Sequence, residues 1–258
     1  VWNEGSVDDI TNGEITLSGD WKFLQGTNAA LGSGNTVRFV GNNVSEIYIT
    51  EFDNAGFGNV ILDKTGGYTT RNNNYSASMK AASLTINEDN TFYSYKLRSS
   101  GDLNMAAGSL LQINQLSDEV EGSVQCSGHL KIDGATCSVD QNFTLNTGGI
   151  LTITNQGAFN NYKSYTGNFL TFAGTLNLLS GSMVIWDENV RFTTTPNLGA
   201  NSVLELGRGM QATTANAFQP AQGSVRFFGS QFATIQVNNG NYFHDLSLSL
   251  IHISEPTR

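Results

Sequence analysis

The chain is a succession of short segments in which apolar and polar residues alternate, separated by turns rich in Gly and Asn. In the segment 174–178, for example, Leu176 and Leu178 alternate with polar neighbours. This alternation predicts β-strands with one buried face. The segments recur at a spacing of roughly 20 to 27 residues, which is typical of the coils of solenoid proteins. We expect six of their leucines to stack as one inward ladder: Leu84, Leu103, Leu130, Leu151, Leu176 and Leu204.

Two longer stretches repeat each other, 37–49 and 225–237. In both, a Val-Arg-Phe strand is followed by a polar turn and a second strand. Alternation places Arg38 and Arg226 on the outer face, where we interpret them as solvated residues and not as ligands. It places the apolar residues of each copy on the inner face: Val37, Phe39, Ile47 and Ile49 in the first, and Val225, Phe227, Ile235 and Val237 in the second.

These patterns predict an all-β protein whose fold is a single-stranded, right-handed parallel β-helix, or β-solenoid. Roughly ten coils of two or three strands would use residues 1–247. Gly and Asn suit its corners because both tolerate a positive φ. An antiparallel β-sandwich or a propeller is the alternative, since short strands separated by turns build those folds too. Two-residue Asn-Gly hairpin turns are rare, however, and Asn12-Gly13 is the main example.

Three stretches resemble the repetitive β-helix regions of large secreted Bacteroidetes proteins: 17–21, 30–41 and 223–249. Between them they contain a Gly-Asp-Trp strand, a Thr-Val-Arg-Phe or Ser-Val-Arg-Phe strand, and a following segment of the form Thr-Ile-x. The resemblance implies export, often by the type IX secretion system, and a secreted or cell-surface location.

The last residues, 248–258, read LSLIHISEPTR. This stretch resembles the in-frame translation of a sequencing adapter. We therefore expect a non-native tail here that belongs to no evolved structure, as for other processing segments and fusion scars.

Charge narrows the range of partners. The 258 residues include 13 Lys and Arg against 22 Asp and Glu, a formal net charge of -9. Nucleic-acid binding needs a basic stripe, and membrane insertion by a helix needs about 20 consecutive apolar residues. Neither feature occurs, so we expect no nucleic-acid partner and no membrane insertion. An extracellular glycan or a surface protein remains as the possible partner.

The acidic pairs do not predict a catalytic site. Glycoside hydrolysis needs two carboxyl groups that face each other. The pairs Asp8-Asp9, Glu88-Asp89, Asp118-Glu119 and Asp187-Glu188 are adjacent in sequence, and adjacent strand residues point to opposite faces. His129 and His244 have no partner at metal-ligand spacing. We therefore predict no catalytic residue, no metal site and no cofactor.

The two cysteines and a cluster of aromatic residues are the remaining candidates for a structural or binding role. Cys126 and Cys137 are the only cysteines, and they form either a disulfide, as suits an exported protein, or two buried thiols. Phe159, Tyr162 and Tyr165 lie in an Asn-rich stretch that we predict to be an exposed loop, where aromatic rings stack on the flat faces of sugars.

Two hypotheses for the function follow. The first is a non-catalytic extracellular solenoid that acts as a surface stalk, adhesin or spacer. The second is a β-helix that binds or degrades glycans, similar to a polysaccharide lyase or a glycoside hydrolase, with Phe159, Tyr162 and Tyr165 holding the sugar.

Overall fold

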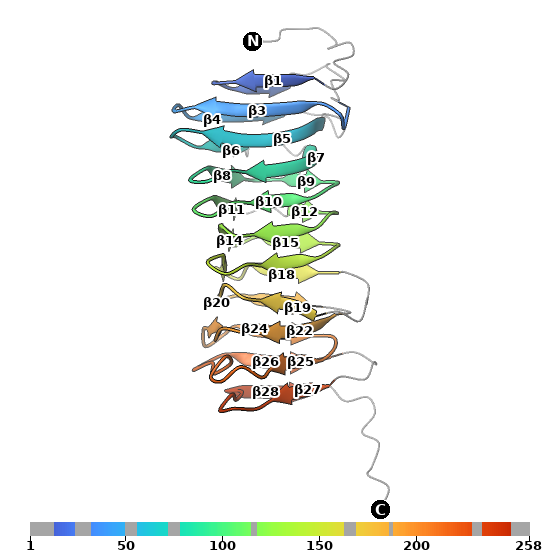
Figure 1. The fold of residues 1–258 in the computed structure, drawn as a ribbon, viewed down its shortest axis with the longest axis vertical. Coiled ribbons are helices and arrows are strands. Elements are labelled where there is room, and N and C mark those ends of the chain that lie inside the picture. The colour runs from blue at the N-terminus through green and yellow to red at the C-terminus, as the bar shows by residue number, and fades with distance from the viewer. Residues whose placement is uncertain are drawn as a thin grey trace, which may run out of the picture.

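The computed structural model describes residues 13–23, 32–49, 56–71, 78–114, 118–162, 169–185, 188–228 and 234–248. In these residues the chain contains no helix and forms a β-solenoid of about nine turns stacked along one axis (Figure 1). Every strand pair between neighbouring turns is parallel, for example β14 (His129–Asp133) with β17 (Ile150–Thr154). The predicted parallel β-helix is confirmed, and the antiparallel alternatives are excluded.

The strands line up on three faces, which we call faces 1, 2 and 3 in the order in which a full turn meets them. Face 1 contains β9 (Leu97–Ser99), β12 (Asp118–Val120), β15 (Thr136–Val139), β18 (Ala158–Asn161), β21 (Ser182–Ile185), β24 (Val203–Leu206), β26 (Ser224–Phe227) and β28 (Asp245–Leu248). Face 2 contains β1 (Glu14–Leu17), β3 (Thr36–Gly41), β5 (Gly56–Lys64), β7 (Met79–Ile86), β10 (Leu103–Met105), β13 (Val124–Cys126), β16 (Phe143–Leu145), β19 (Phe169–Phe172), β22 (Asn189–Phe192), β25 (Met210–Ala212) and β27 (Ile235–Val237).

Face 3 is a separate nine-stranded sheet. Besides β14 and β17 it contains β2 (Trp21–Phe23), β4 (Ser45–Ile49), β6 (Thr69–Arg71), β8 (Thr91–Ser94), β11 (Leu110–Asn114), β20 (Thr175–Leu178) and β23 (Asn197–Leu198). Faces 1 and 2 meet in the long strand β7, whose first half pairs with β9 and whose second half pairs with β10.

The predicted single ladder of six leucines is wrong, although all six are buried. Leu84 pairs with Leu103 on face 2, and Leu130, Leu151 and Leu176 stack on face 3. Leu204 lies on face 1, between Met183 and Val225. One turn carries up to three strands with the same alternation, so the pattern identifies an inward residue without identifying its face.

The two repeated stretches occupy different faces. Val37 and Phe39 are buried on face 2, whereas Val225 and Phe227 are buried on face 1. Ile235, predicted to be buried, is 38% exposed. It lies in β27, in the last turn of the part of the chain that the structure describes, and no described strand packs beyond it.

Aromatic rings fill the core of the C-terminal half. Phe143, Phe172 and Phe192 follow one another in ring contact, with centroid distances of 6.0 and 5.2 Å. Phe218 continues this column at 5.1 Å from Phe192. Ring pairs at these distances contribute about 0.5 to 1.5 kcal/mol each beyond the area they bury.

Glycine determines how closely the turns approach at the corner that leads into face 3. A Cβ added at Gly149 would lie 2.3 Å from the Cys126 carbonyl oxygen, and one added at Gly174 would lie 2.2 Å from the Gly149 carbonyl oxygen. No other residue fits where two backbones meet this closely. The corner therefore keeps neighbouring turns in register.

Candidate functional site

The outer surface of face 1 gathers charged side chains from consecutive turns. The strand register aligns Lys80 with Arg98, and Arg98 with Glu119. A second outward row follows two residues later in each strand, because residues i and i+2 share a face. It contains Glu121 and Asp140. The Glu121 N–H donates a hydrogen bond to the Ser99 carbonyl oxygen, and the Asp140 N–H donates one to the Val120 carbonyl oxygen, each in the turn before.

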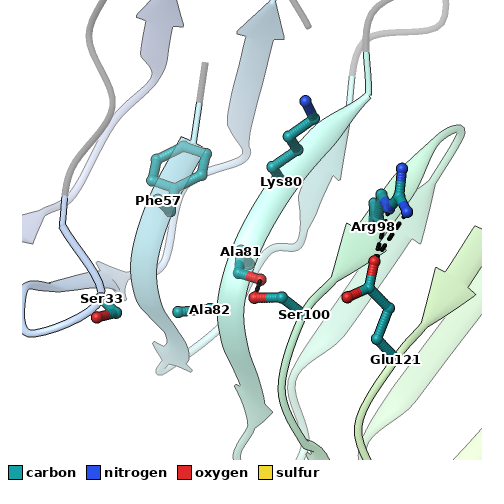
Figure 2. Close-up of a pocket in the computed structure, with 8 residues that line it drawn as sticks. All are labelled: Ser33, Phe57, Lys80, Ala81, Ala82, Arg98, Ser100 and Glu121. Carbon is teal, nitrogen blue, oxygen red and sulfur yellow. Dashed lines mark hydrogen bonds and ion pairs between the residues drawn. The ribbon is translucent and has the colours of Figure 1, made fainter. Parts of the chain in front are cut away.

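Arg98 is the centre of this surface. Its Nε lies 3.3 Å from Glu119 Oε2, and its Nη2 lies 2.8 Å from Glu121 Oε1, so one guanidinium bridges two carboxylates of the next turn. Figure 2 shows the contact with Glu121. The hydrogen bond to Glu121 and the charge of Glu119 raise the pKa of Arg98. All three side chains are about two-fifths to one-half exposed, at 48%, 43% and 38%. Such exposed pairs contribute little to stability.

Two hollows adjoin at Arg98, and together we call them the Arg98 groove. The first has a volume of about 360 Å³ and is lined by Phe57, Lys80, Arg98, Ser100 and Glu121 among others (Figure 2). The second has a volume of about 300 Å³. Its lining includes Lys96, Arg98, Asp118, Glu119, Asp140 and Tyr162. Ligand sites of proteins begin at this size.

A buried polar cluster interrupts the apolar core behind the second hollow. Arg71 and Ser94 occupy inward positions of face 3, where the other turns have residues such as Ile47 and Ile113. Asp118 is the first of two inward residues of β12, and its Oδ1 accepts a hydrogen bond of 2.9 Å from the Leu97 N–H.

Burial changes the proton affinity of both charged members of this cluster. It raises the pKa of Asp118 to about 7, against the opposing effects of Ser94, the Leu97 N–H and the Arg71 charge. It lowers the pKa of Arg71 to about 10. Desolvation disfavours the charged form of each group, which explains the opposite directions of the two shifts.

The prediction that adjacent acids point apart is confirmed for Asp118 and Glu119, since Asp118 is buried and Glu119 lies on the outer surface. Sequence reasoning missed two acids that lie near Arg98 on the same outer surface, Glu121 and Asp140. The spacing of Glu119 and Glu121 is a sequence signal for a shared strand face. Asp140 joins them only through the register of the next turn.

The structure separates the three predicted sugar-stacking residues. Phe159 is fully buried in β18, with its ring 4.7 Å from that of Phe143, so its predicted exposure is wrong. Alternation along β18 turns Phe159 inward, toward the core. Tyr162 is 47% exposed and lines the second hollow. Tyr165 lies outside the described residues.

The two cysteines are free, buried thiols. Cys126 ends β13 on face 2, and Cys137 lies in β15 on face 1. Burial raises the pKa of Cys126 to about 11 and raises that of Cys137 further. Neither is therefore a reactive thiolate at neutral pH. Of the two alternatives that the sequence left open, the structure shows the two buried thiols.

Among the described residues, no three His, Cys, Asp or Glu side chains are grouped so that they could hold a metal ion. The same residues include no helix with the length and apolar character needed to span a bilayer.

Comparison with protein-family models, curated proteins and solved structures finds no match for this chain.

Proposed function

We propose that this chain is a non-catalytic extracellular β-solenoid that acts as a surface stalk, adhesin or spacer. The observation that carries the proposal is the unbroken parallel pairing of neighbouring turns, which makes one elongated stack (Figure 1). Each turn adds roughly 4.8 Å to the stack and contacts mainly its neighbours. Such a fold gains reach by adding turns, and it leaves its outer faces available for contacts.

An extracellular location is supported by the resemblance of 17–21, 30–41 and 223–249 to secreted Bacteroidetes β-helix regions. We propose that the chain is exported, with type IX secretion as the route that the resemblance implies. We also propose that 248–258 is a translated adapter. Of that segment the structure describes only Leu248, as the last residue of β28.

The arrangement of carboxylates favours the non-catalytic role over glycan cleavage. Glycosidases shield their general acid from water and keep it protonated. Glu119 and Glu121 are instead partly exposed, and both are ion-paired with Arg98. Asp118 is shielded, but it is buried in the core and accepts a hydrogen bond from Leu97.

Deleting one complete turn tests the spacer role. Thr136 pairs in register with Ala158, so removing 136–157 joins Ala135 to Ala158 and preserves the stacking. We expect the variant to fold and small-angle X-ray scattering to show a rod shorter by about 5 Å. Deleting 136–145 is the matched control, because it removes a partial turn and breaks the register.

Two results would contradict the proposal. One is that the complete-turn deletion destabilises the protein as much as the partial deletion does. The other is that the purified chain cleaves polysaccharides. A panel of neutral and uronate polymers, assayed for new reducing ends and for unsaturated products, measures the second.

A further inference from the structure

We propose that the Arg98 groove binds a neutral oligosaccharide, held in an extended form along the solenoid axis and released uncleaved. This site goes beyond the proposed spacer role and does not depend on it.

The shape of the groove points to an extended ligand. Its lining runs from Ser33, before β3, and Phe57 in β5 to Tyr162, directly after β18. Phe57 and Tyr162 are separated by five steps between paired strands, from β5 through β7, β9, β12 and β15 to β18, or about 24 Å at the usual strand spacing. Arg98 lines both hollows. A chain of sugar units can occupy both hollows and cross Arg98, whereas a compact ligand fills only one.

The charges of the lining favour a neutral ligand. Besides the buried Asp118, the two hollows present three cations and three carboxylates: Lys80, Lys96, Arg98, Glu119, Glu121 and Asp140. An anionic polysaccharide would meet these carboxylates and a protein of net charge -9. Sugar hydroxyl groups both donate and accept hydrogen bonds, so they satisfy a lining of mixed sign.

Tyr162 supplies the apolar contact. Tyr162 is 47% exposed and lines the second hollow together with Asp140, so an aromatic side chain and hydrogen-bonding groups line the same hollow. Tyrosine suits such a place because it combines an apolar ring with a polar hydroxyl group. The C–H face of a sugar ring can cover the tyrosine while the sugar hydroxyls reach Asp140 and Lys96.

A peptide fits this groove less well. Peptides that add to a sheet need an unpaired strand edge. The floor of the groove is the outer surface of face 1, where β9 and β12 are already paired to neighbouring turns on both sides. Side chains alone are available there, which is the kind of surface that a sugar chain can use.

Calorimetric titration of the whole chain tests the proposal. The probes are hexasaccharides of β-1,4-linked glucose, mannose and xylose, the matching disaccharides, and hexagalacturonate as the anionic probe. We expect at least one neutral hexasaccharide to bind more tightly than its disaccharide and more tightly than hexagalacturonate. Tyr162→Ala should weaken hexasaccharide binding about tenfold, which corresponds to 1.4 kcal/mol.

Two further variants make the test specific. Tyr242→Ala removes a tyrosine that is 51% exposed in the last described turn, away from the groove, and should bind as the unchanged protein does. Lys80→Ala alters only the first hollow. It should weaken the hexasaccharide but not the disaccharide, which the second hollow holds beside Tyr162. Circular dichroism checks that each variant is folded.

The proposal fails if no neutral hexasaccharide of the panel binds, if hexagalacturonate binds best, or if Tyr162→Ala and Tyr242→Ala have the same effect. None of these results affects the spacer role, which the turn deletion tests separately.

Discussion

Replacing Asp118 by Asn should change how the stability of the solenoid depends on pH. In the folded protein burial raises the pKa of Asp118 to about 7, from an ordinary value of 3.8. The folded state therefore holds this proton more tightly than the unfolded state. Stability from this group is fully present below about pH 4, and it is lost as the pH rises toward and through 7.

The shift in the pKa of Asp118 on folding sets how much the stability changes with pH. A difference of about three pKa units corresponds to about 4 kcal/mol between the protonated and ionised limits. The neutral Asn keeps an oxygen that can accept the Leu97 N–H, and it needs no proton. Arg71 opposes the effect because its charge favours an ionised Asp118, but burial outweighs it in the raised pKa. Relative to the unchanged protein, Asp118→Asn should gain stability as the pH rises.

Urea unfolding of both proteins between pH 4 and pH 9 measures this difference. Other carboxyl groups titrate in both proteins, so subtracting one curve from the other isolates Asp118. Asp140→Asn, an outward aspartate from the next turn, is the matched control. A difference between Asp118→Asn and the unchanged protein that stays constant from pH 4 to pH 9 would refute the reasoning.

Three further predictions concern stability. Gly174→Ala places a Cβ 2.2 Å from a backbone oxygen and should lower the free energy of unfolding by about 3 kcal/mol, measured by urea unfolding. Gly56→Ala is the control: its Cβ would have its nearest contact at 3.8 Å, so the free energy of unfolding should change by no more than about 0.5 kcal/mol. Phe192→Ala empties part of the aromatic column and should cost about 3 to 5 kcal/mol; a loss no larger than that of the partly buried Phe169→Ala would contradict this packing. Deleting 248–258 should change stability by no more than about 1 kcal/mol, and a large drop in the thermal midpoint would mean that the segment is integral.

Alternation predicts which side chains turn inward, but it does not predict which face of a turn they occupy. Leu84 and Leu204 are both inward residues of Gly- or Ser-led strands, yet they lie on faces 2 and 1. Face assignment depends on the length of each corner, and corners of different lengths have similar Gly- and Asn-rich compositions. The repeated stretches that contain Val37 and Val225 also lie on different faces, despite their similar sequences.

The burial of single residues near the candidate site was also not predicted from the sequence. Phe159 was expected in an exposed loop, and Asp118 was expected only to point away from Glu119. The register makes them inward residues of the same row, on either side of Cys137. Asp118 is therefore an ionisable residue among apolar inward residues. Its burial cannot be predicted from the sequence, because it depends on the strand register that also places Arg71 in the core.

The register that stacks the core also stacks the outer surface, and this connects the fold to its proposed ligand. Because Lys80, Arg98 and Glu119 occupy one outward row, their spacing is that of the strands and repeats along the solenoid axis. A polymer of sugar units is also a repeating ligand, so it can make contacts at successive turns of the stack. The outward rows can change in sequence without disturbing the core, since alternation separates the two sets of side chains. Binding can therefore be confined to the turns from β5 to β18, and the remaining turns can serve as spacer.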